Sequence, residues 1–182
     1  MKTPISYYGG KQELAKKIIN LIPSHKTYCE PFIGGAAIFF AKPVSKAEII
    51  NDINSEVVNF YEVLKHDFFA LQAEIECCDA LKIIRQNDNG ETFFYLDPPY
   101  VGACQGHYDG YSQSDFNELI DLLTKIEGRF LLSSFRNTYL SEASKHYGWS
   151  QIELKMNTHP SFIPDQHKSK IEVLTANYPI SL

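Results

Sequence analysis

Residues 92–100 read TFFYLDPPY, and the rest of the chain is organised around them. The run from Phe93 to Leu96 is apolar on both faces of an extended chain, which is typical of a central strand in a parallel sheet. The strand has to stop near Asp97, because Pro98 and Pro99 fix their own φ angles and have no N–H to pair with a neighbour. We therefore predict a buried strand over residues 92–97 that ends in a rigid corner.

On either side of this strand, apolar runs of similar length alternate with helical patterns. Strands are predicted over residues 27–32, 47–51, 129–134, 151–154 and 172–177. Helical spacing covers residues 13–21, 36–41, 55–65, 68–76, 80–85, 115–126 and 138–146, with Ser114 and Asn137 as N-caps. This alternation predicts an α/β fold with a mostly parallel sheet. At 182 residues, 44% of them apolar, the chain suits a single domain over residues 1–182.

The composition argues against several classes of protein. No run approaches the ~20 apolar residues that cross a bilayer, and the N-terminus lacks the apolar core of a signal peptide. The four cysteines form no C-x-x-C pair, and the six histidines show no metal-ligand spacing. We expect a cytoplasmic protein with reduced thiols, no metal and no membrane partner.

Charge is distributed unevenly along the chain. The net charge of −5 divides into +3 for residues 1–53, −10 for residues 54–128 and +2 for residues 129–182. A polyanion such as DNA is attracted by clustered Lys and Arg. If one binds, the two ends of the chain have to supply its surface.

The turn Phe32-Ile33-Gly34-Gly35-Ala36 follows the first predicted strand and precedes a helix. Its glycines allow a tight turn and a close approach of a ligand to the backbone. Asp52 ends the second predicted strand 18 positions after Gly34, near the spacing of a carboxylate that accepts hydrogen bonds from a ribose. The turn is not G-x-G-x-x-G, which disfavours a dinucleotide site. Two interpretations of these residues remain open: a binding site for a nucleotide-like cofactor, and an ordinary turn with a helix-capping Asp.

The corner Asp97-Pro98-Pro99-Tyr100 offers mainly hydrogen-bond acceptors, the Asp97 carboxylate and the Pro98 carbonyl. Two convergent acceptors suit a planar –NH2 group, and the Tyr100 ring gives a face for stacking. Binding both hydrogens of an amine favours an orientation with its lone pair toward an electrophile. The methyl group of a sulfonium cofactor at the Gly34 turn would be such an electrophile.

Several motifs, in order along the chain, resemble those of the Dam-like DNA adenine methyltransferases. They are Tyr7-Tyr8-Gly9-Gly10-Lys11, Glu30-Pro31-Phe32-Ile33-Gly34-Gly35-Ala36, Asn51-Asp52-Ile53-Asn54 and Asp97-Pro98-Pro99-Tyr100. Residues 172–178, EVLTANY, are similar to the last strand of that family. The resemblance implies a Rossmann-like fold whose mostly parallel mixed sheet has an antiparallel last strand. It also implies methyl transfer from S-adenosylmethionine to the exocyclic amine of adenine in DNA.

The resemblance also implies roles for individual residues. S-adenosylmethionine would be bound by Tyr7, Lys11, Phe32, Gly34, Asp52, Asp79 and Asp97, with Asp52 on the ribose and Asp79 near the adenine. Tyr7 stands where the family usually has a tryptophan. Asp97 would touch both the cofactor and the target amine, and Pro98, Pro99 and Tyr100 would complete the catalytic site.

The chain departs from the family between Asp52 and Asp97. Family members usually insert a helical recognition domain there, whereas this chain has 44 intervening residues and a shortened connection over residues 53–91. Double-stranded DNA with the target base flipped out is still the implied partner, and a separate recognition subunit is another. Two alternatives stay open: the same chemistry on cytosine, an RNA adenine or a glutamine amide, and a degenerate domain that only binds the cofactor or a partner.

Two long irregular stretches remain, at residues 98–113 and 156–169. The first, with His107, Tyr108 and Tyr111, is interpreted either as a lid over a flipped base or as a packed loop. The second leads into residues 167–170, HKSK, with Phe162 upstream. It is interpreted either as a source of phosphate contacts and a wedge or as a solvated surface loop.

Overall fold

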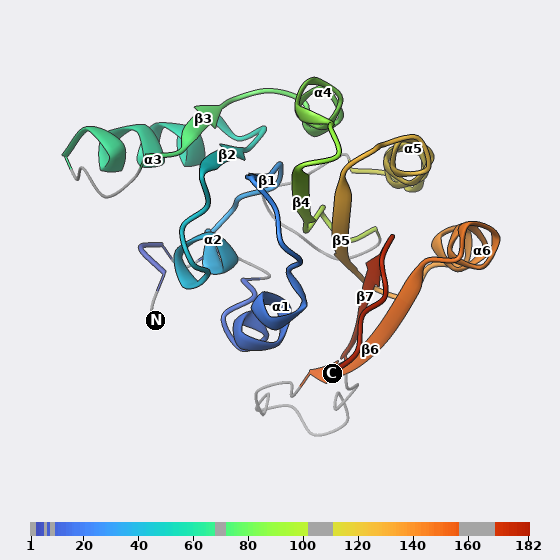
Figure 1. Cartoon of the computed structure of the whole chain (residues 1–182). Helices are drawn as coiled ribbons and strands as arrows, with labels where there is room; N and C mark the ends of the chain where they lie inside the picture. The colour runs from blue at the N-terminus through green and yellow to red at the C-terminus, as the bar shows by residue number, and fades with distance from the viewer. Residues whose placement is uncertain (1–2, 6, 8–9, 68–71, 102–110, 157–169) are drawn as a thin grey trace.

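The computed structural model describes residues 3–5, 7, 10–67, 72–101, 111–156 and 170–182 (Figure 1). Its strands form one sheet in the order β3-β2-β1-β4-β5-β7-β6. They are β1 (Thr27–Glu30), β2 (Ala47–Asn51), β3 (Glu74–Glu76), β4 (Thr92–Leu96), β5 (Arg129–Ser134), β6 (Ser150–Met156) and β7 (Lys170–Ala176). Each neighbouring pair in the series β3-β2-β1-β4-β5 is parallel. Strand β7 is antiparallel to both of its neighbours, β5 and β6. The predicted mixed sheet with a reversed last strand is confirmed.

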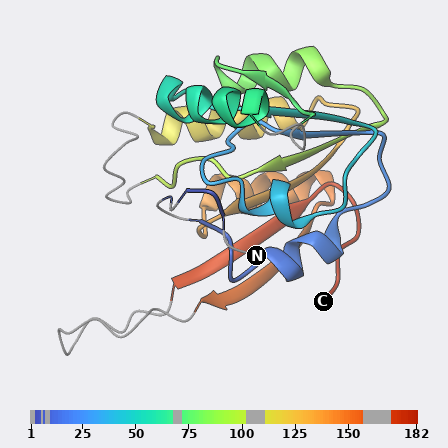
Figure 2. The same cartoon turned by 90° about the vertical axis from the view of Figure 1, so that its left-hand side faces the viewer.

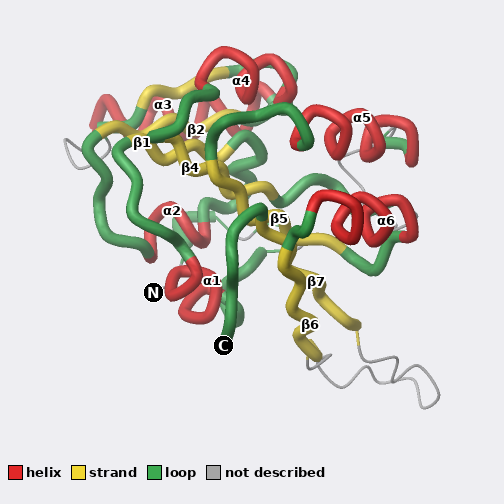
Figure 3. Tube along the Cα trace, turned by 45° about the vertical axis from the view of Figure 1, so that its right-hand side comes forward, coloured by secondary structure: helices red, strands yellow, loops and turns green. Residues whose placement is uncertain are grey.

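Helices cover both faces of this sheet (Figures 1 and 3). One face carries α1 (Ala15–Leu21), α2 (Ala37–Ala41) and α3 (Ser55–Asp67), and the other carries α4 (Ala80–Asn87), α5 (Gln113–Leu123) and α6 (Thr138–Tyr147). Successive side chains of β4 alternate between the two cores: Phe93 and Tyr95 pack with the first, Phe94 and Leu96 with the second. All five residues of β4 are buried, as predicted for a central strand.

Two local predictions are wrong. A helix is predicted over residues 68–76, but residues 74–76 form the edge strand β3, in which Ile75 lies opposite Ile50 of β2. A segment this short is decided by its pairing with a neighbour, which no local pattern encodes. The helix expected after Ser114 begins two residues earlier, because Ser112 and Asp115 form a reciprocal capping box. Asn137 caps α6 as predicted.

The carboxyl ends of the parallel strands lie at one edge of the sheet, on the left in Figure 2. Because β7 is reversed, its first residues lie at this edge too. The connection between Asp52 and Asp97 contributes α3, β3 and α4, all of them elements of the sheet and its helical layers. Among the described residues, no helix is long and apolar enough to cross a membrane.

Part of each irregular stretch lies outside the described residues. This holds for residues 102–110, with His107 and Tyr108, and for residues 157–169, with Phe162 and His167. Tyr111 is half-buried and packs on the second core. The two interpretations of each stretch therefore stay predictions.

Candidate active site at the carboxyl edge of the sheet

The turn after β1 is held by the carboxylate that follows β2. Gly34 has a φ of +44°, which favours glycine, and its N–H donates to Asp52 Oδ2 at 3.0 Å. The other oxygen, Oδ1, accepts from the Asn54 N–H at 2.9 Å. Asp52 is 1% exposed. The structure thus brings Gly34 and Asp52 together, and the first role of the Asp52 carboxylate is to fix the backbone of this turn.

Tyr7 packs directly over the glycines. A Cβ atom on Gly34 would lie 2.9 Å from Tyr7 Cδ1, and one on Gly35 would lie 3.0 Å from Tyr7 Cβ. At these distances an added Cβ atom would force Tyr7 to shift. Tyr7 therefore packs against the glycine turn, and both glycines are favoured by this close approach, Gly34 also by its backbone conformation.

Asn51 ties the next segment of the chain to the same edge. Its Nδ2 donates to the carbonyls of Pro31 and Cys78, each at 3.0 Å, and its Oδ1 accepts from the Cys78 N–H at 3.0 Å. These bonds hold the chain beside Asp79, whose carboxylate caps α4 by accepting from the Lys82 N–H at 3.1 Å. Asp79 thus lies near the edge, in a capping role.

Phe32, the remaining residue predicted to bind the cofactor, is half-buried and packs against the second core. It follows β1 within the turn that contains Gly34. Its ring is therefore partly enclosed by the second core rather than fully exposed.

Lys11 and Asp97 form the most direct contact of the site. Lys11 Nζ lies 2.7 Å from Asp97 Oδ1 and 2.8 Å from Oδ2, although the two residues are 86 positions apart. Lys11 is 4% exposed, whereas the Asp97 side chain is 20% exposed. Charge-assisted contacts of this length are strong when they are shielded from water. The predicted cofactor-binding lysine and the predicted catalytic carboxylate are therefore one unit.

Tyr100 connects Asp97 to a second carboxylate. Its hydroxyl lies 3.1 Å from Asp97 Oδ1 and donates to Oε1 of Glu172, at the start of β7. Ser133 of β5 donates to the same Glu172 oxygen. Lys11 Nζ lies 3.7 Å from Glu172 Oε1 and 4.8 Å from the centre of the Tyr100 ring. Tyr100 is thus held in place both by the hydrogen bonds of its hydroxyl and by the contact of its ring with the Lys11 ammonium.

The other parts of the corner are also held firmly. Pro98 is buried and Pro99 is half-buried. The Tyr100 ring lies 4.3 Å from the ring of Phe135, which follows β5. An aromatic contact this close restricts the tilt of the Tyr100 ring.

Burial shifts the pKa values of the acidic groups around the corner. Burial raises the pKa of Glu172 above its ordinary value, Lys11 opposes this shift, and the charge of Asp97 adds to it. Burial also raises the pKa of the Tyr100 hydroxyl well above its ordinary value, with Asp97 and Glu172 as further causes. The hydroxyl therefore stays protonated and can donate across the neutral pH range.

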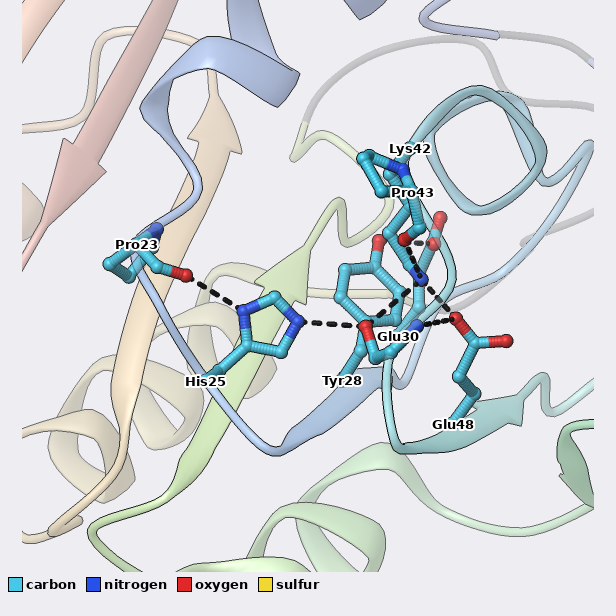
Figure 4. Close-up of polar contacts among 8 residues, drawn as sticks. Pro23, His25, Tyr28, Glu30, Lys42, Pro43 and Glu48 are labelled. Atoms are coloured by element: carbon cyan, nitrogen blue, oxygen red, sulfur yellow. Dashed lines mark hydrogen bonds and ion pairs between the residues drawn. The ribbon is translucent and has the colours of Figure 1, made fainter.

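A second polar network lies on the α1–α3 face of the sheet (Figure 4). The Tyr28 hydroxyl donates to Glu30 Oε2 at 2.6 Å, and the ammonium of Lys42 lies 4.0 Å from the centre of the Tyr28 ring. Lys42 is paired with Glu48, and His25 Nε2 lies 2.8 Å from Ser45 Oγ. These contacts join the end of α2 to the starts of β1 and β2.

Glu30 is the member of this network nearest the glycine turn. It accepts from the Phe39 N–H in α2, and burial raises its pKa from 4.5 to about 8. Its role is therefore to hold α2 against β1, largely as a neutral acid at pH 7.

Two residues of the site, Glu172 and Ser133, are not found by sequence reasoning. The one local indication is a carboxylate in the otherwise apolar run Ile171-Glu172-Val173-Leu174. A charged side chain at a buried strand position is uncommon unless it is paired. Among the described residues, no cluster of His, Cys, Asp or Glu is placed to hold a metal ion.

The chain matches the family model described as D12 class N6 adenine-specific DNA methyltransferase over residues 7–71 and 64–158. This match covers well over half of the chain. The chain belongs to this family. The matched residues include Lys11, the glycine turn and the Asp97 corner, but not Glu172.

Individual relatives agree with this family. The Type II methyltransferase M1.LlaDCHI of Lactococcus lactis subsp. cremoris is 47% identical over 58 residues, which are 31% of this chain and 20% of that protein. A DNA adenine methylase of Serratia marcescens is 29% identical over 123 residues, covering 58% of this chain and 45% of that protein. The chain thus spans less than half the length of these relatives.

Solved structures agree on the fold. A putative methyltransferase of Escherichia coli aligns with a TM-score of 0.61 over 94% of this chain and 89% of its own, at 11% identity. At that identity the likeness concerns the fold alone. The fold is that of the Rossmann-like methyltransferases.

Proposed function

We propose that this chain transfers a methyl group from S-adenosylmethionine to the exocyclic amine of adenine in DNA. The observation that carries the proposal is the position of Asp97: a carboxylate in contact with Lys11 at the end of the central strand β4, beside the turn fixed by Gly34 and Asp52. In open α/β sheets, ligands bind at this edge.

The residues of the glycine turn fit S-adenosylmethionine. Gly34 and Gly35 keep the turn tight beneath Tyr7, and the Asp52 carboxylate lies beside this turn as the proposed partner of a ribose hydroxyl. When bound, the cofactor supplies an electrophilic methyl group on a sulfonium. Tyr7, Lys11, Phe32 and Asp79 are the other proposed contacts, with Asp79 toward the adenine of the cofactor.

The corner residues orient the acceptor. The Asp97 carboxylate and the Pro98 carbonyl accept the two hydrogens of the target amine, Pro99 keeps the corner rigid, and the Tyr100 ring, supported by Phe135, stacks on the base. A base inside a duplex cannot reach such a corner, so the proposed partner is double-stranded DNA with the adenine flipped out.

Recognition of the DNA sequence is a separate task. Residues 53–67 and 72–91 are used by α3, β3 and α4, and residues 54–128 carry a net charge of −10, which repels phosphates. We therefore propose that sequence recognition is supplied from outside this connection, with a separate subunit as one source.

Calorimetric titration of S-adenosylmethionine into wild type and Asp52→Asn, beside a methyl-transfer assay on unmethylated DNA, tests the proposal. We expect binding by the wild type, at least tenfold weaker binding by Asp52→Asn, and N6-methyladenine as the product. Asp121→Asn, on the outer side of α5, is the matched control and should bind as the wild type does.

Other outcomes separate the alternatives. Methylation of cytosine, RNA or a glutamine amide in place of DNA adenine would keep the chemistry and change the acceptor. Cofactor binding without transfer to any of these would contradict catalysis by this chain alone and favour a partner-dependent or degenerate domain. Absence of cofactor binding would overturn the proposal.

A further inference from the structure

Glu172 is a buried carboxylate beside Asp97 that the proposed roles leave unused. It is 1% exposed, and its Oε2 atom has no hydrogen-bond partner among the described residues. Burying a carboxyl oxygen without a donor is costly, so such an atom in a site needs a reason. Its other oxygen, Oε1, accepts from Tyr100 and Ser133.

The Tyr100 hydroxyl has the geometry of a bridge. It has one hydrogen and lies within hydrogen-bond distance of both Asp97 Oδ1 and Glu172 Oε1, so it can donate to only one of them at a time. When it donates to Glu172, a lone pair of the hydroxyl oxygen faces Asp97. This arrangement is unfavourable toward a carboxylate and favourable toward a carboxylic acid, which donates. The bridge therefore suits an Asp97 that has just received a proton.

The proposed reaction produces one such proton. As the amine nitrogen forms its bond to the methyl carbon, the C–S electron pair returns to sulfur and the nitrogen takes over the positive charge, which it loses by releasing one hydrogen as a proton. Asp97, the acceptor of the amine hydrogen, receives it first. Both Asp97 oxygens also contact Lys11, so the proton has to move on before the site is restored.

We propose that Glu172 is the terminal acceptor of this proton, through Tyr100. Asp97 Oδ1 gives its proton to the Tyr100 oxygen while Tyr100 gives its own to Glu172, so that Asp97 is an anion again, Tyr100 is unchanged and Glu172 is a neutral acid. The relay rests on the proposed methyl transfer. It assigns a role to a residue that lies 75 positions after Asp97 in the chain.

The surroundings of Glu172 favour a carboxyl group that takes up a proton. The groups that face it are Lys11, Asp97 and Tyr100, with Ser133 from β5, Tyr95 from β4 and, opposite it on β6, the apolar Leu154. Burial and the Asp97 charge raise its pKa, while Lys11 limits the rise. A carboxyl group with a raised pKa holds a proton more readily than an exposed glutamate does.

Two substitutions separate a proton acceptor from a structural support. In Glu172→Gln the amide oxygen still accepts from Tyr100 and Ser133, but the group cannot take a proton; Glu172→Asp keeps the carboxylate. We expect the single-turnover rate of Glu172→Gln to fall about 10²-fold, the lower end for a positioned proton acceptor, and Glu172→Asp to recover most of it. The wild-type rate should fall at acid pH as Glu172 becomes protonated, and Glu172→Gln should lose this dependence.

An equilibrium measurement tests the coupling without turnover. In protein labelled with 13C at the glutamate carboxyl groups, the Glu172 signal is the one lost in Glu172→Gln. We expect it to titrate above the range of an ordinary glutamate, and Asp97→Asn to lower the titration midpoint by removing a neighbouring negative charge. Glu153→Gln, an exposed carboxylate substitution on β6, is the control and should change neither the rate nor the Glu172 midpoint.

The possible results distinguish a proton relay from a structural role of Glu172 and from a failure of the proposed function. Wild-type transfer with an equally active Glu172→Gln overturns the relay and leaves the proposed function standing. Equal losses in both Glu172 variants, with an unchanged pH profile, mark a structural role and also overturn it, as does a Glu172 signal insensitive to Asp97→Asn. A wild type that transfers no methyl group overturns the proposed function, and the relay fails with it.

Discussion

Glu30 and Asp97 occupy comparable positions at the ends of the adjacent parallel strands β1 and β4, yet their surroundings are opposite. Both Asp97 oxygens contact the Lys11 ammonium, and the Asp97 side chain is 20% exposed. Glu30 is 2% exposed and accepts from the Tyr28 hydroxyl and the Phe39 N–H, and burial raises its pKa to about 8. At one edge of the sheet, a carboxyl group that contacts a cation directly and partly faces solvent is suited to chemistry, whereas a buried one that is hydrogen-bonded to a hydroxyl and a backbone N–H is suited to a structural role.

The largest expected effect is on catalysis. Asp97→Asn should lower the rate of methyl transfer by 10²-fold or more, because the amide turns one of the two acceptors into a donor and cannot receive the proton. Glu30→Gln, the matched carboxyl-to-amide change on β1, should leave the rate within a few-fold of the wild type. Single-turnover assays with saturating DNA and cofactor measure both. A similar loss of rate in the two variants would contradict the assignment of a catalytic role to Asp97 and a structural role to Glu30.

The second expected effect is on the pH dependence of stability. Between pH 4.5 and about 8 the folded protein binds a proton at Glu30 that the unfolded chain has released, so this group makes the free energy of unfolding fall as the pH rises through that window. At about 1.4 kcal/mol per pKa unit, the loss amounts to a few kcal/mol. Urea unfolding from pH 5 to pH 8.5 should show a flatter curve for Glu30→Gln than for wild type. Parallel curves would show that Glu30 does not titrate in this window.

The third expected effect concerns the cation. Lys11→Met leaves Asp97 and Glu172 close together without their shared ammonium, and should lower the free energy of unfolding by about 3 kcal/mol. Adding Asp97→Asn should recover much of this loss, because the unpaired charge is then gone. Denaturant unfolding of both single variants and the double variant measures the coupling free energy between Lys11 and Asp97. A double variant less stable than Lys11→Met would contradict the charge explanation.

The smallest expected effects concern the glycine turn that both carboxyl groups flank. Gly34→Ala should cost about 1–3 kcal/mol, because it combines a positive φ with a Cβ only 2.9 Å from Tyr7 Cδ1. Gly148→Ala, at a φ of +70° in open space, should cost less, and Gly90→Ala, with neither strain nor neighbours, should be near neutral. Thermal unfolding of the three variants ranks them. An equal cost for Gly34→Ala and Gly148→Ala would rule out the Tyr7 contact as a contribution.

Much of this site is readable from local patterns. The apolar run that ends at Asp97-Pro98-Pro99-Tyr100 predicts a buried strand and its end, because burial on both faces and the missing proline N–H groups are properties of neighbouring residues. The link between Gly34 and Asp52 also follows from pattern, since the ends of adjacent parallel strands meet at one edge. Lys11 is assigned to the same site only by the resemblance of residues 7–11 to the N-terminal motif of the family.

Other features depend on which strands become neighbours. The short strand β3 exists because it pairs with β2, so its own residues do not encode it. Tyr28 and Glu30 are two residues apart, but the pKa of Glu30 depends on the burial that α2 and the rest of the first core provide. Tyr7 contacts the glycine turn only in the folded chain, because it lies 27 positions before Gly34 in the sequence.

Glu172 is the clearest case of a residue placed by topology. Its contact with Tyr100 joins positions 72 residues apart, and it exists because β7 runs antiparallel beside β5 and so brings its first residues to the edge where the parallel strands end. Periodicity, turn chemistry and capping act over a few residues and are visible in a sequence. Strand order acts over the whole chain, and the partners of a buried charge are decided at that level.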